Sequence, residues 1–393
     1  MFINIQDNRH FKKLLTKQKY SSVVTNIFIK IRRIHFFGLE EMETKNMRAV
    51  VVRETGSSDV LKIEEIKTPS PGDGQALVRV DACGVCRHDI LVRKGIFRKN
   101  VSYPVVLGHE ISGEIVSTGK NFKEFKCGDR VVCLPWSNLC RICKFCRTGR
   151  NASCPDAILI GDTGLNGGYA EYVIIDDYNI VKLPEQISAD EASFISCAIG
   201  TVFNAVIDIG KVTPRDTVLV TGANGGLGIH AIQFANLSGA RVIAHGVSAN
   251  VKNELCKYGV DEVVITKRGE DFSQIINDLT DGNGVDVVID CVGTSTFKSV
   301  LKSIAHYGRW VFCGQISGDF VKLSPAQIFL KGINLLSTYG STKEHLESAV
   351  KLVAQGKIKP VIAKRFSLAD AKNAHDILEA GGNAGRIVLT VFK

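Results

Sequence analysis

The run Asp216-Thr-Val-Leu-Val-Thr-Gly-Ala-Asn-Gly-Gly-Leu-Gly228 decides the fold of this 393-residue chain. It is typical of a buried β-strand, Thr217–Thr221, that runs into a glycine-rich turn and then into a helix with apolar residues at helical spacing. Glycines between a strand and a helix allow a tight turn and let backbone N–H groups approach a pyrophosphate. The turn therefore predicts a dinucleotide site formed by seven residues: Gly222, Ala223, Asn224, Gly225, Gly226, Leu227 and Gly228.

Downstream of this run, strand-like segments alternate with helix-length segments. The strand-like segments are Arg241–Ala244, Glu262–Thr266, Val285–Asp290 and Arg309–Gly314. Such alternation implies right-handed crossovers and a parallel, doubly wound sheet. A glycine turn on its own can be a simple tight entry to a helix. Here the strand, the helix and the next strand all fall where a dinucleotide motif needs them, which favours a binding loop.

The end of the second strand distinguishes the two nicotinamide dinucleotides. An NAD site needs an Asp or Glu about 20 residues after the glycines, where it bonds the ribose hydroxyls. The sequence has Gly246 there and no carboxylate nearby, whereas Ser248, Asn250 and Lys252 offer hydrogen bonds and a positive charge. Since a carboxylate would repel a 2′-phosphate, the sequence predicts NADP(H) in preference to NAD(H), bound by Gly246, Ser248 and Lys252. Taken alone, Lys252 is equally typical of a solvent-facing helix.

Upstream, from Met47 to about residue 185, short strands are separated by Gly, Pro and Asp. Examples are Ala76–Val80, Glu114–Ser117, Arg130–Leu134 and Tyr169–Ile174. This pattern predicts a β-rich domain of barrel type. Ser188, with Glu191 three residues later, marks the start of the helical part. Near the end of the chain we expect a helix at Glu344–Ala354 and a closing strand at Arg386–Phe392.

Charge and hydropathy exclude two classes of partner. No run of 18 residues is apolar throughout, so no transmembrane helix is predicted. Residues 1–46 hold nine Lys/Arg against four Asp/Glu, and they carry +5 of the net charge of +9. The remainder is an ordinary solvated surface, so no nucleic-acid partner is expected. Residues 1–46 are interpreted as a basic extension, either a transit peptide or dispensable translated upstream sequence, the second favoured by Met42 and Met47.

Four of the twelve cysteines lie within fifteen residues, at Cys140, Cys143, Cys146 and Cys154. Four thiolates match the tetrahedral preference of Zn²⁺ and leave no open position, which predicts a structural zinc site. An iron–sulfur cluster also takes four cysteines. Disulfide pairing is disfavoured by the x2 spacings and by the absence of a secretory signal in the sequence. This cysteine usage is typical of a reducing compartment, and a cytoplasmic location is expected.

Three further segments carry metal-ligating residue types: Gly84-Val-Cys-Arg-His-Asp89, Gly108-His-Glu110 and Ser196-Cys-Ala-Ile-Gly-Thr201. With the cysteine loop, and in this order, they resemble the zinc-dependent medium-chain alcohol dehydrogenase family over Met47 to Lys393. The resemblance implies an α/β protein with two domains. A GroES-like β-barrel catalytic domain would comprise 47–200 completed by 339–393, and a Rossmann cofactor domain 201–338. Family members are dimers or tetramers, so a homodimer or homotetramer is expected.

The resemblance also implies site residues. Cys86, His109 and Cys197 would hold a catalytic zinc, the second zinc of the chain, with Glu110 as a nearby or exchangeable ligand. Asp89 would orient His109, and Arg87 would reach the cofactor pyrophosphate. Hydride would then pass between NADP(H) and an alcohol or aldehyde.

The chain departs from the family pattern at the proton-transfer positions. His88 stands where the family commonly has Ser or Thr, and Leu91 replaces a histidine that relays the proton in some members. We hypothesise that His88 carries the alcohol proton, because its pKa would lie near working pH. The alternative is that His88 lines the cleft and water carries the proton.

Two other functions are compatible with the sequence. The chain, especially Val218–Ala235 and Ile358–Ala363, is also similar to archaeal acryloyl-CoA reductases, so the substrate could be an enoyl thioester, or a quinone, reduced by NADPH. A non-catalytic NADPH-binding protein is disfavoured, because it would not need the complete ligand set. Trp136, Phe97 and Ile199 suggest an apolar substrate pocket.

Overall fold

The computed structural model describes residues 45–96, 101–162 and 164–392. The predicted extension 1–46 lies outside these ranges apart from Lys45 and Asn46, and Asn46 is the first residue of strand β1 (Asn46–Val52). Residues 46–393 form one unit of the chain. In the described ranges, no helix is both long enough and apolar enough to cross a membrane.

A six-stranded parallel sheet has the order β13-β12-β11-β14-β15-β16. Its strands are β11 (Thr217–Thr221), β12 (Arg241–Gly246), β13 (Glu262–Ile265), β14 (Val285–Asp290), β15 (Ile304–Phe312) and β16 (Asn334–Ser337). In chain order this is 3-2-1-4-5-6, the order of a doubly wound dinucleotide-binding sheet. The predicted doubly wound sheet is confirmed, and β11 and β14 have the predicted bounds.

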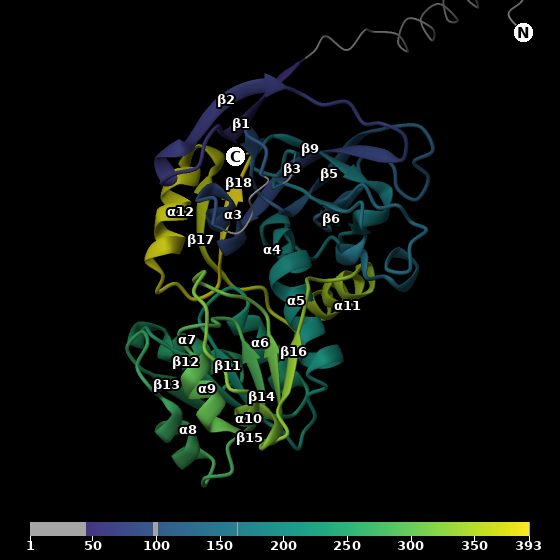
Figure 1. The fold of residues 1–393 in the computed structure, drawn as a ribbon. Coiled ribbons are helices and arrows are strands. Elements are labelled where there is room, and N and C mark those ends of the chain that lie inside the picture. Colours follow the sequence, from purple (N-terminus) through teal and green to yellow (C-terminus); the bar gives the residue numbers. More distant parts are fainter. Residues whose placement is uncertain (1–44, 97–100, 163, 393) are drawn as a thin grey trace, which may run out of the picture. The chain divides into compact units, whose positions relative to one another are not determined.

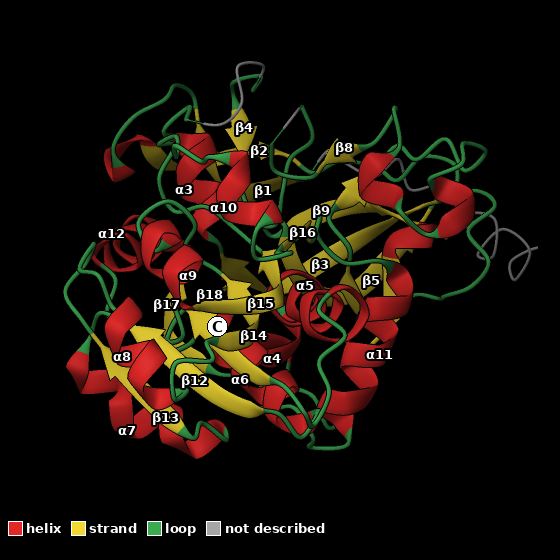
Figure 2. Ribbon diagram, turned by 60° about the horizontal axis from the view of Figure 1, so that its bottom comes forward, coloured by secondary structure: helices red, strands yellow, loops and turns green. Residues whose placement is uncertain are grey.

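Apolar layers cover both faces of this sheet. Alternate side chains of a strand point to opposite faces, so Val218 of β11 joins one layer and Leu219 the other. The Val218 layer contains apolar side chains of α6 (Gly228–Leu237), whereas the Leu219 layer contains those of α8 (Ser273–Leu279) and α9 (Phe297–Ser303). Figure 2 shows the helices against the strands. The short helices of this part are α7 (Lys252–Leu255) and α10 (Pro325–Phe329).

The rest of the chain is rich in β-structure, as predicted. A seven-stranded sheet has the order β10-β6-β5-β3-β18-β17, and β9 also pairs with β3. These strands are β3 (Gln75–Val85), β5 (Glu110–Thr118), β6 (Arg130–Cys133), β9 (Tyr172–Asp176), β10 (Ile180–Lys182), β17 (Ile362–Ser367) and β18 (Arg386–Thr390). Smaller sheets contain β1 with β2 (Leu61–Lys67) and β4 (Val105–Val106), and β7 (Trp136–Ser137) with β8 (Ile158–Leu159).

The C-terminal segment completes the seven-stranded sheet. β18 lies between β17 and β3, with Val388 opposite Gly84, and Gly84 is in turn opposite Glu110 of β5. In Figure 1 the yellow elements β17, β18 and α12 (Ala371–Ala380) lie beside the purple and blue strands of the N-terminal half. The first residue of β18 is thereby brought close to the end of β3 and the start of β5. The other helices here are α3 (Arg87–Arg93), α4 (Ala189–Ser193), α5 (Gly200–Phe203) and α11 (Lys343–Ala354).

Candidate active site

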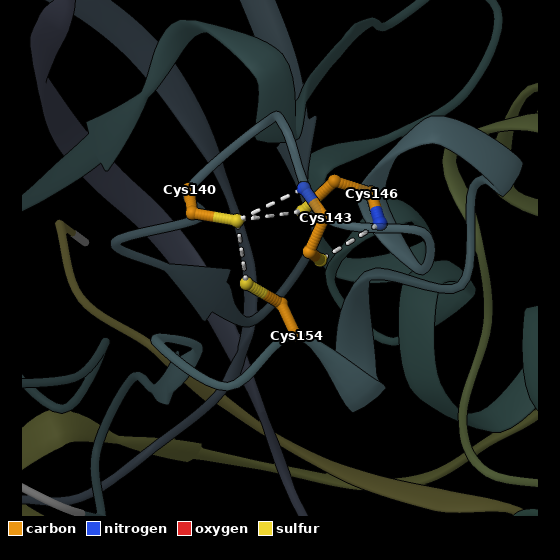
Figure 3. Close-up of side chains that lie close together, drawn as sticks. All are labelled: Cys140, Cys143, Cys146 and Cys154. Atoms are coloured by element: carbon orange, nitrogen blue, oxygen red, sulfur yellow. Dashed lines mark hydrogen bonds between the residues drawn. The ribbon is translucent and has the colours of Figure 1, made fainter.

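The four clustered cysteines meet in one loop. One sulfur from each of Cys140, Cys143, Cys146 and Cys154 lies within 4.8 Å of the other three. The Cys140 sulfur is 3.6 Å from that of Cys154 and 4.0 Å from that of Cys146 (Figure 3). The backbone N–H of Cys143 donates to the Cys140 sulfur, and this bond is the main reason why the pKa of Cys140 falls to about 7. All twelve cysteines lie in the described ranges and none is in a disulfide, so the loop offers the four thiols that a tetrahedral zinc takes.

A second group of metal-ligating side chains gathers where β3, β5 and a π-helical turn meet. Cys86 caps the N-terminus of α3, Glu110 begins β5 with His109 just before it, and Cys197 lies in the π-helical turn Ile195–Ile199. One ligand atom from each of the four residues lies within 4.8 Å of the other three. Two thiols and an imidazole, with a carboxylate beside them, are a donor set that suits Zn²⁺.

The electrostatics of the second group favour a thiolate at Cys86. The hydrogen bond with the Cys197 thiol, followed by the charges of Arg386 and His109, holds the pKa of Cys86 well below its ordinary value although the side chain is buried. A metal ligand must be a thiolate rather than a thiol. The structure thus brings all four ligand residues that the family resemblance implied into one place.

Asp89 fixes the orientation of His109. The Nδ1 of His109 is 2.9 Å from Asp89 Oδ1, and the backbone N–H of Cys86 donates to Asp89 Oδ2 over 2.9 Å. Burial alone would raise the pKa of Asp89, but the charge of His109 and its hydrogen bond keep that pKa below its ordinary value. The carboxylate therefore accepts a hydrogen bond from Nδ1–H and leaves Nε2 of His109 available on the side of the thiols. This is the arrangement expected of a carboxylate behind a metal-bound histidine.

Arg386, which the sequence analysis did not single out, ties the ligand group to the glycine turn. Its Nε donates to Glu110 Oε2 over 2.8 Å, its Nη2 also pairs with Glu110 Oε1, and Nη2 is 3.4 Å from the Cys86 sulfur. A Cβ built on Gly226 would lie 2.8 Å from Arg386 Nη1. Burial raises the pKa of Glu110 to about 7 even though Arg386 opposes this shift. No local motif marks Arg386, because it is one cation at the start of an apolar strand.

A cavity of about 410 Å³ lies over the glycine turn. Eight of the predicted cofactor residues line it: Arg87, Gly222, Asn224, Gly225, Gly226, Leu227, Gly228 and Gly246. Ala223 is fully buried, and Ser248 and Lys252 are not among the described residues on its walls. Gly222 has φ +61°, and a Cβ on Gly228 would lie 2.3 Å from the Gly222 carbonyl oxygen, so the turn needs glycine at both positions.

Besides Arg386, which is paired with Glu110, two further arginines line this cavity. Arg87 was predicted there, whereas Arg268, three positions beyond Ile265 at the end of β13, was not. A Cβ built on Gly381 would lie 4.0 Å from Arg268 Nη2, so the guanidinium lies close to the C-terminal end of α12. In the described part of the chain, neither arginine forms an ion pair. Two guanidinium groups in one cavity suit a ligand with several phosphates.

His88 lies beside the second ligand group. Its ring centroid is 5.2 Å from that of His109, with the two ring planes at 88°. Its Nε2 is 3.2 Å from Asp162 Oδ2, and Asp162 is fully buried while His88 is partly exposed. A buried carboxylate therefore orients His88, a partner that the sequence analysis missed because Asp162 lies far along the chain. Trp136 is buried and packs against Tyr339, whereas Phe97 lies outside the described residues.

Comparison with known proteins agrees with this geometry. Residues 72–185 match the alcohol dehydrogenase GroES-like domain, and residues 226–355 match the zinc-binding dehydrogenase domain. The chain is 33% identical over 344 residues to an acryloyl-coenzyme A reductase of Sulfurisphaera tokodaii, which covers 87% of this chain and 99% of that protein. It is 34% identical over 353 residues to an NAD-dependent alcohol dehydrogenase of Sulfolobus acidocaldarius, which covers 88% and 100%.

A solved structure has the same fold. The crystal structure of AibC matches with a TM-score of 0.83 and 38% sequence identity, covering 90% of this chain and 99% of that one. The two domains, the two groups of metal-ligating side chains and these relatives agree along nearly the whole described chain. It follows that the chain belongs to the zinc-dependent medium-chain dehydrogenase/reductase family, the family of the alcohol dehydrogenases.

Proposed function

We propose that this protein transfers a hydride between NADP(H) and an alcohol or aldehyde, with one catalytic and one structural zinc per chain. The observation that carries the proposal is the position of Arg386. It contacts both Glu110 and the Cys86 sulfur, and it also lines the cavity over the glycine turn. The ligand group and the cofactor cavity therefore share a wall, as direct hydride transfer between a metal-held substrate and a dinucleotide requires.

The chain has residues that would bind the catalytic zinc and residues that would bind the dinucleotide. A zinc at Cys86, His109 and Cys197 would supply a Lewis acid for the substrate oxygen, and the dinucleotide would supply or accept the hydride. The backbone N–H groups of the glycine turn and the Arg87 guanidinium would bind the pyrophosphate. Asp89 would keep Nε2 of His109 free for the metal.

His88 would move the alcohol proton. Its contact with buried Asp162 and its partial exposure beside His109 support this role, since a relay must reach both the site and water. Replacing His88 by alanine is expected to lower kcat for alcohol oxidation by about 10²-fold or more, the low end of what a positioned acid–base group contributes. Unchanged kcat would mean that water carries the proton.

The preference for NADP(H) rests on the residues around the ribose end of the cavity. Gly246, at the end of β12, has no carboxylate, while Arg268 offers a charge without an ion pair in the described ranges. Glu270 also lines the cavity, but its carboxylate accepts the backbone N–H of Lys267 over 2.8 Å. An arginine near the second strand is the usual partner of a 2′-phosphate.

The second candidate is reduction of a C=C bond in an enoyl thioester, or of a quinone. It is favoured by the 33% identity to an acryloyl-coenzyme A reductase. The test is NADPH oxidation by the purified protein against a matched panel of aldehydes and enoyl-CoA thioesters, for the native chain and for Cys86→Ala. Cys133→Ala, a buried cysteine outside both ligand groups, is the control.

The alcohol dehydrogenase reaction is supported if the native chain turns over aldehydes, Cys86→Ala abolishes this turnover and Cys133→Ala retains it. Turnover with enoyl thioesters alone, at the same rate in Cys86→Ala, would replace it by C=C reduction. Binding of NADPH without turnover of any substrate would leave a non-catalytic NADPH-binding protein.

We also propose a homodimer or homotetramer. β16 is an edge strand of the parallel sheet, and large apolar side chains in the segment that precedes it along the chain are exposed, with Phe320 at 100%, Phe329 at 67% and Leu330 at 71%. Open sheet edges and exposed apolar side chains are each typical of an interface. The mass in solution, measured by light scattering, tests this.

We also propose the domain limits: the catalytic domain comprises 47–200 and 339–393, and the cofactor domain comprises 201–338. Their support is that all strands of the parallel sheet lie between 217 and 337. The cytoplasmic location stays a prediction.

A further inference from the structure

A row of buried polar side chains extends from Asp89 away from the cofactor cavity. The hydroxyl of Tyr169 is 3.0 Å from Asp89 Oδ2 and 3.1 Å from Nε2 of His375. Nδ1 of His375 is 3.2 Å from Nη1 of Arg93, and Arg93 pairs with Glu379. Tyr169 and His375 are fully buried and Arg93 is 1% exposed. Three separate parts of the chain therefore meet behind the ligand group: α3, the segment before β9, and α12.

The direction of every hydrogen bond in this row can be assigned. A guanidinium only donates, so Nδ1 of His375 is an acceptor and the imidazole carries its proton on Nε2. Burial lowers the pKa of His375 to about 4, which agrees with a neutral ring. Nε2–H then donates to the Tyr169 oxygen, and the Tyr169 hydroxyl donates to Asp89 Oδ2.

Through Asp89, this row of hydrogen bonds reaches His109, a candidate metal ligand. With Oδ2 of Asp89 occupied by Tyr169 and the Cys86 N–H, Oδ1 accepts Nδ1–H of His109. If the Asp89 carboxylate rotated, or if another donor occupied its Oδ1, the proton of the His109 ring would no longer be held on Nδ1. The row therefore determines which nitrogen of His109 faces the thiols.

The ring of Tyr169 also packs against the backbone next to His109. A Cβ built on Gly108, at φ +97°, would lie 2.4 Å from Cδ1 of Tyr169, so the ring packs directly on the backbone before His109. The backbone N–H of Tyr169 donates to the Leu107 carbonyl, and that of Gly168 to the Gly108 carbonyl. A phenylalanine would supply this packing. The hydroxyl, buried among apolar side chains, is needed only for Asp89 and His375.

We propose that Tyr169 and His375 are positioning residues for the metal ligand His109, acting through Asp89 to hold its Nε2 toward a zinc bound by Cys86 and Cys197. This inference rests on the proposed zinc site. Removing an outer partner of a metal-bound histidine typically weakens metal binding by about 10–100-fold. Loss of the Tyr169 hydroxyl is therefore expected to accelerate zinc release from this site and to leave the four-cysteine site unchanged.

The experiment measures zinc release from the holoenzyme to a chromogenic chelator, with the four-cysteine loop as internal reference. The variants are Tyr169→Phe and the control Tyr103→Phe, whose hydroxyl donates to the Val92 carbonyl over 3.0 Å and does not contact Asp89. We expect two zinc equivalents in the native protein, one of which leaves about tenfold faster in Tyr169→Phe. Tyr103→Phe should match the native protein in both phases.

A second pair of variants approaches the row from α12. His375→Gln keeps an acceptor for Arg93 and a donor for Tyr169, whereas His375→Leu removes both. Zinc release should be near native in the glutamine variant and faster in the leucine variant, and this pair decides the question if Tyr169→Phe does not fold.

Native kinetics in Tyr169→Phe, equal acceleration of both zinc equivalents, or equal rates in the two His375 variants would overturn the inference. A native protein that holds only the four-cysteine zinc would instead overturn the proposed function itself. The two failures are thus distinguishable without measuring turnover.

Discussion

Replacing the buried His230 by glutamine should make the fold less sensitive to acid. His230 lies in α6 and is fully buried. Its Nδ1 donates to the Gly226 carbonyl over 2.6 Å, and its Nε2 accepts the backbone N–H of Val361 over 3.1 Å. One nitrogen must carry a proton and the other must not, so only the neutral ring fits. Burial lowers the pKa of His230 to about 4.

The free energy follows from linkage. An unfolded histidine has a pKa of about 6.5, so below that pH the unfolded chain binds a proton that the folded chain excludes. The stability is present at neutral pH and is lost as the pH falls from about 6.5 toward 4. For one such histidine the loss between pH 7 and pH 5 is about 2 kcal/mol. Burial lowers the pKa of His245 and His375 to about 4 as well, which steepens the acid dependence of the native protein.

Urea unfolding at pH 7 and at pH 5 measures this effect. Glutamine keeps a donor for Gly226 and an acceptor for Val361 but does not titrate. Between the two pH values, the native protein and the exposed-histidine control His306→Gln should lose about 2 kcal/mol more than His230→Gln. Zinc release at pH 5 affects all three proteins and cancels in the comparison. An equal loss in His230→Gln and the native protein would refute the reasoning.

Three further changes test the sites. Arg268→Ala should raise KM for NADPH about tenfold, or about 1.4 kcal/mol, and leave KM for NADH unchanged in steady-state assays; an equal rise for both would exclude a 2′-phosphate contact. Cys143→Ala should remove one zinc per chain by metal analysis, while the exposed Cys127→Ser keeps both. Arg386→Met should lower the free energy of unfolding in urea by about 3–5 kcal/mol, since it leaves the buried Glu110 carboxylate unpaired. Adding Glu110→Gln should restore part of that loss, and no restoration would argue against the pair.

The elements that the sequence predicts best are those whose signal is local. Thr217–Thr221 and Val285–Asp290 are central strands buried on both faces, so each is a continuous apolar run bounded by polar residues. β9 is different: it begins at Tyr172 rather than Tyr169, because the Tyr169 N–H pairs with the Leu107 carbonyl instead of continuing the ladder. That contact joins distant parts of the chain, and no pattern within the strand reveals it.

The same distinction divides the candidate site. The four-cysteine loop is visible in the sequence because its ligands lie within one segment. Cys86, His109 and Cys197 are far apart, and only the family resemblance implied that they meet. Two neighbouring site residues, His88 and Glu110, have the partners Asp162 and Arg386. Each partner is a single charged residue in a strand or loop, with no periodic signal in the sequence.

The ion pair of Arg386 and Glu110 illustrates why the partners of the site residues cannot be recognised from any single segment of the sequence. Gly84 is opposite both Glu110 and Val388 in the sheet, and a Cβ on Gly84 would lie 2.0 Å from Glu110 Oε2. The absence of a side chain in β3 therefore makes room for a carboxylate from β5, and a cation from β18 neutralises it. Each of these residues is unfavourable by itself, since a glycine weakens a strand and a buried charge is costly. Only the assembled sheet makes them compatible, so the pair that connects the ligand group to the cofactor cavity exists only once the last strand has joined the first ones.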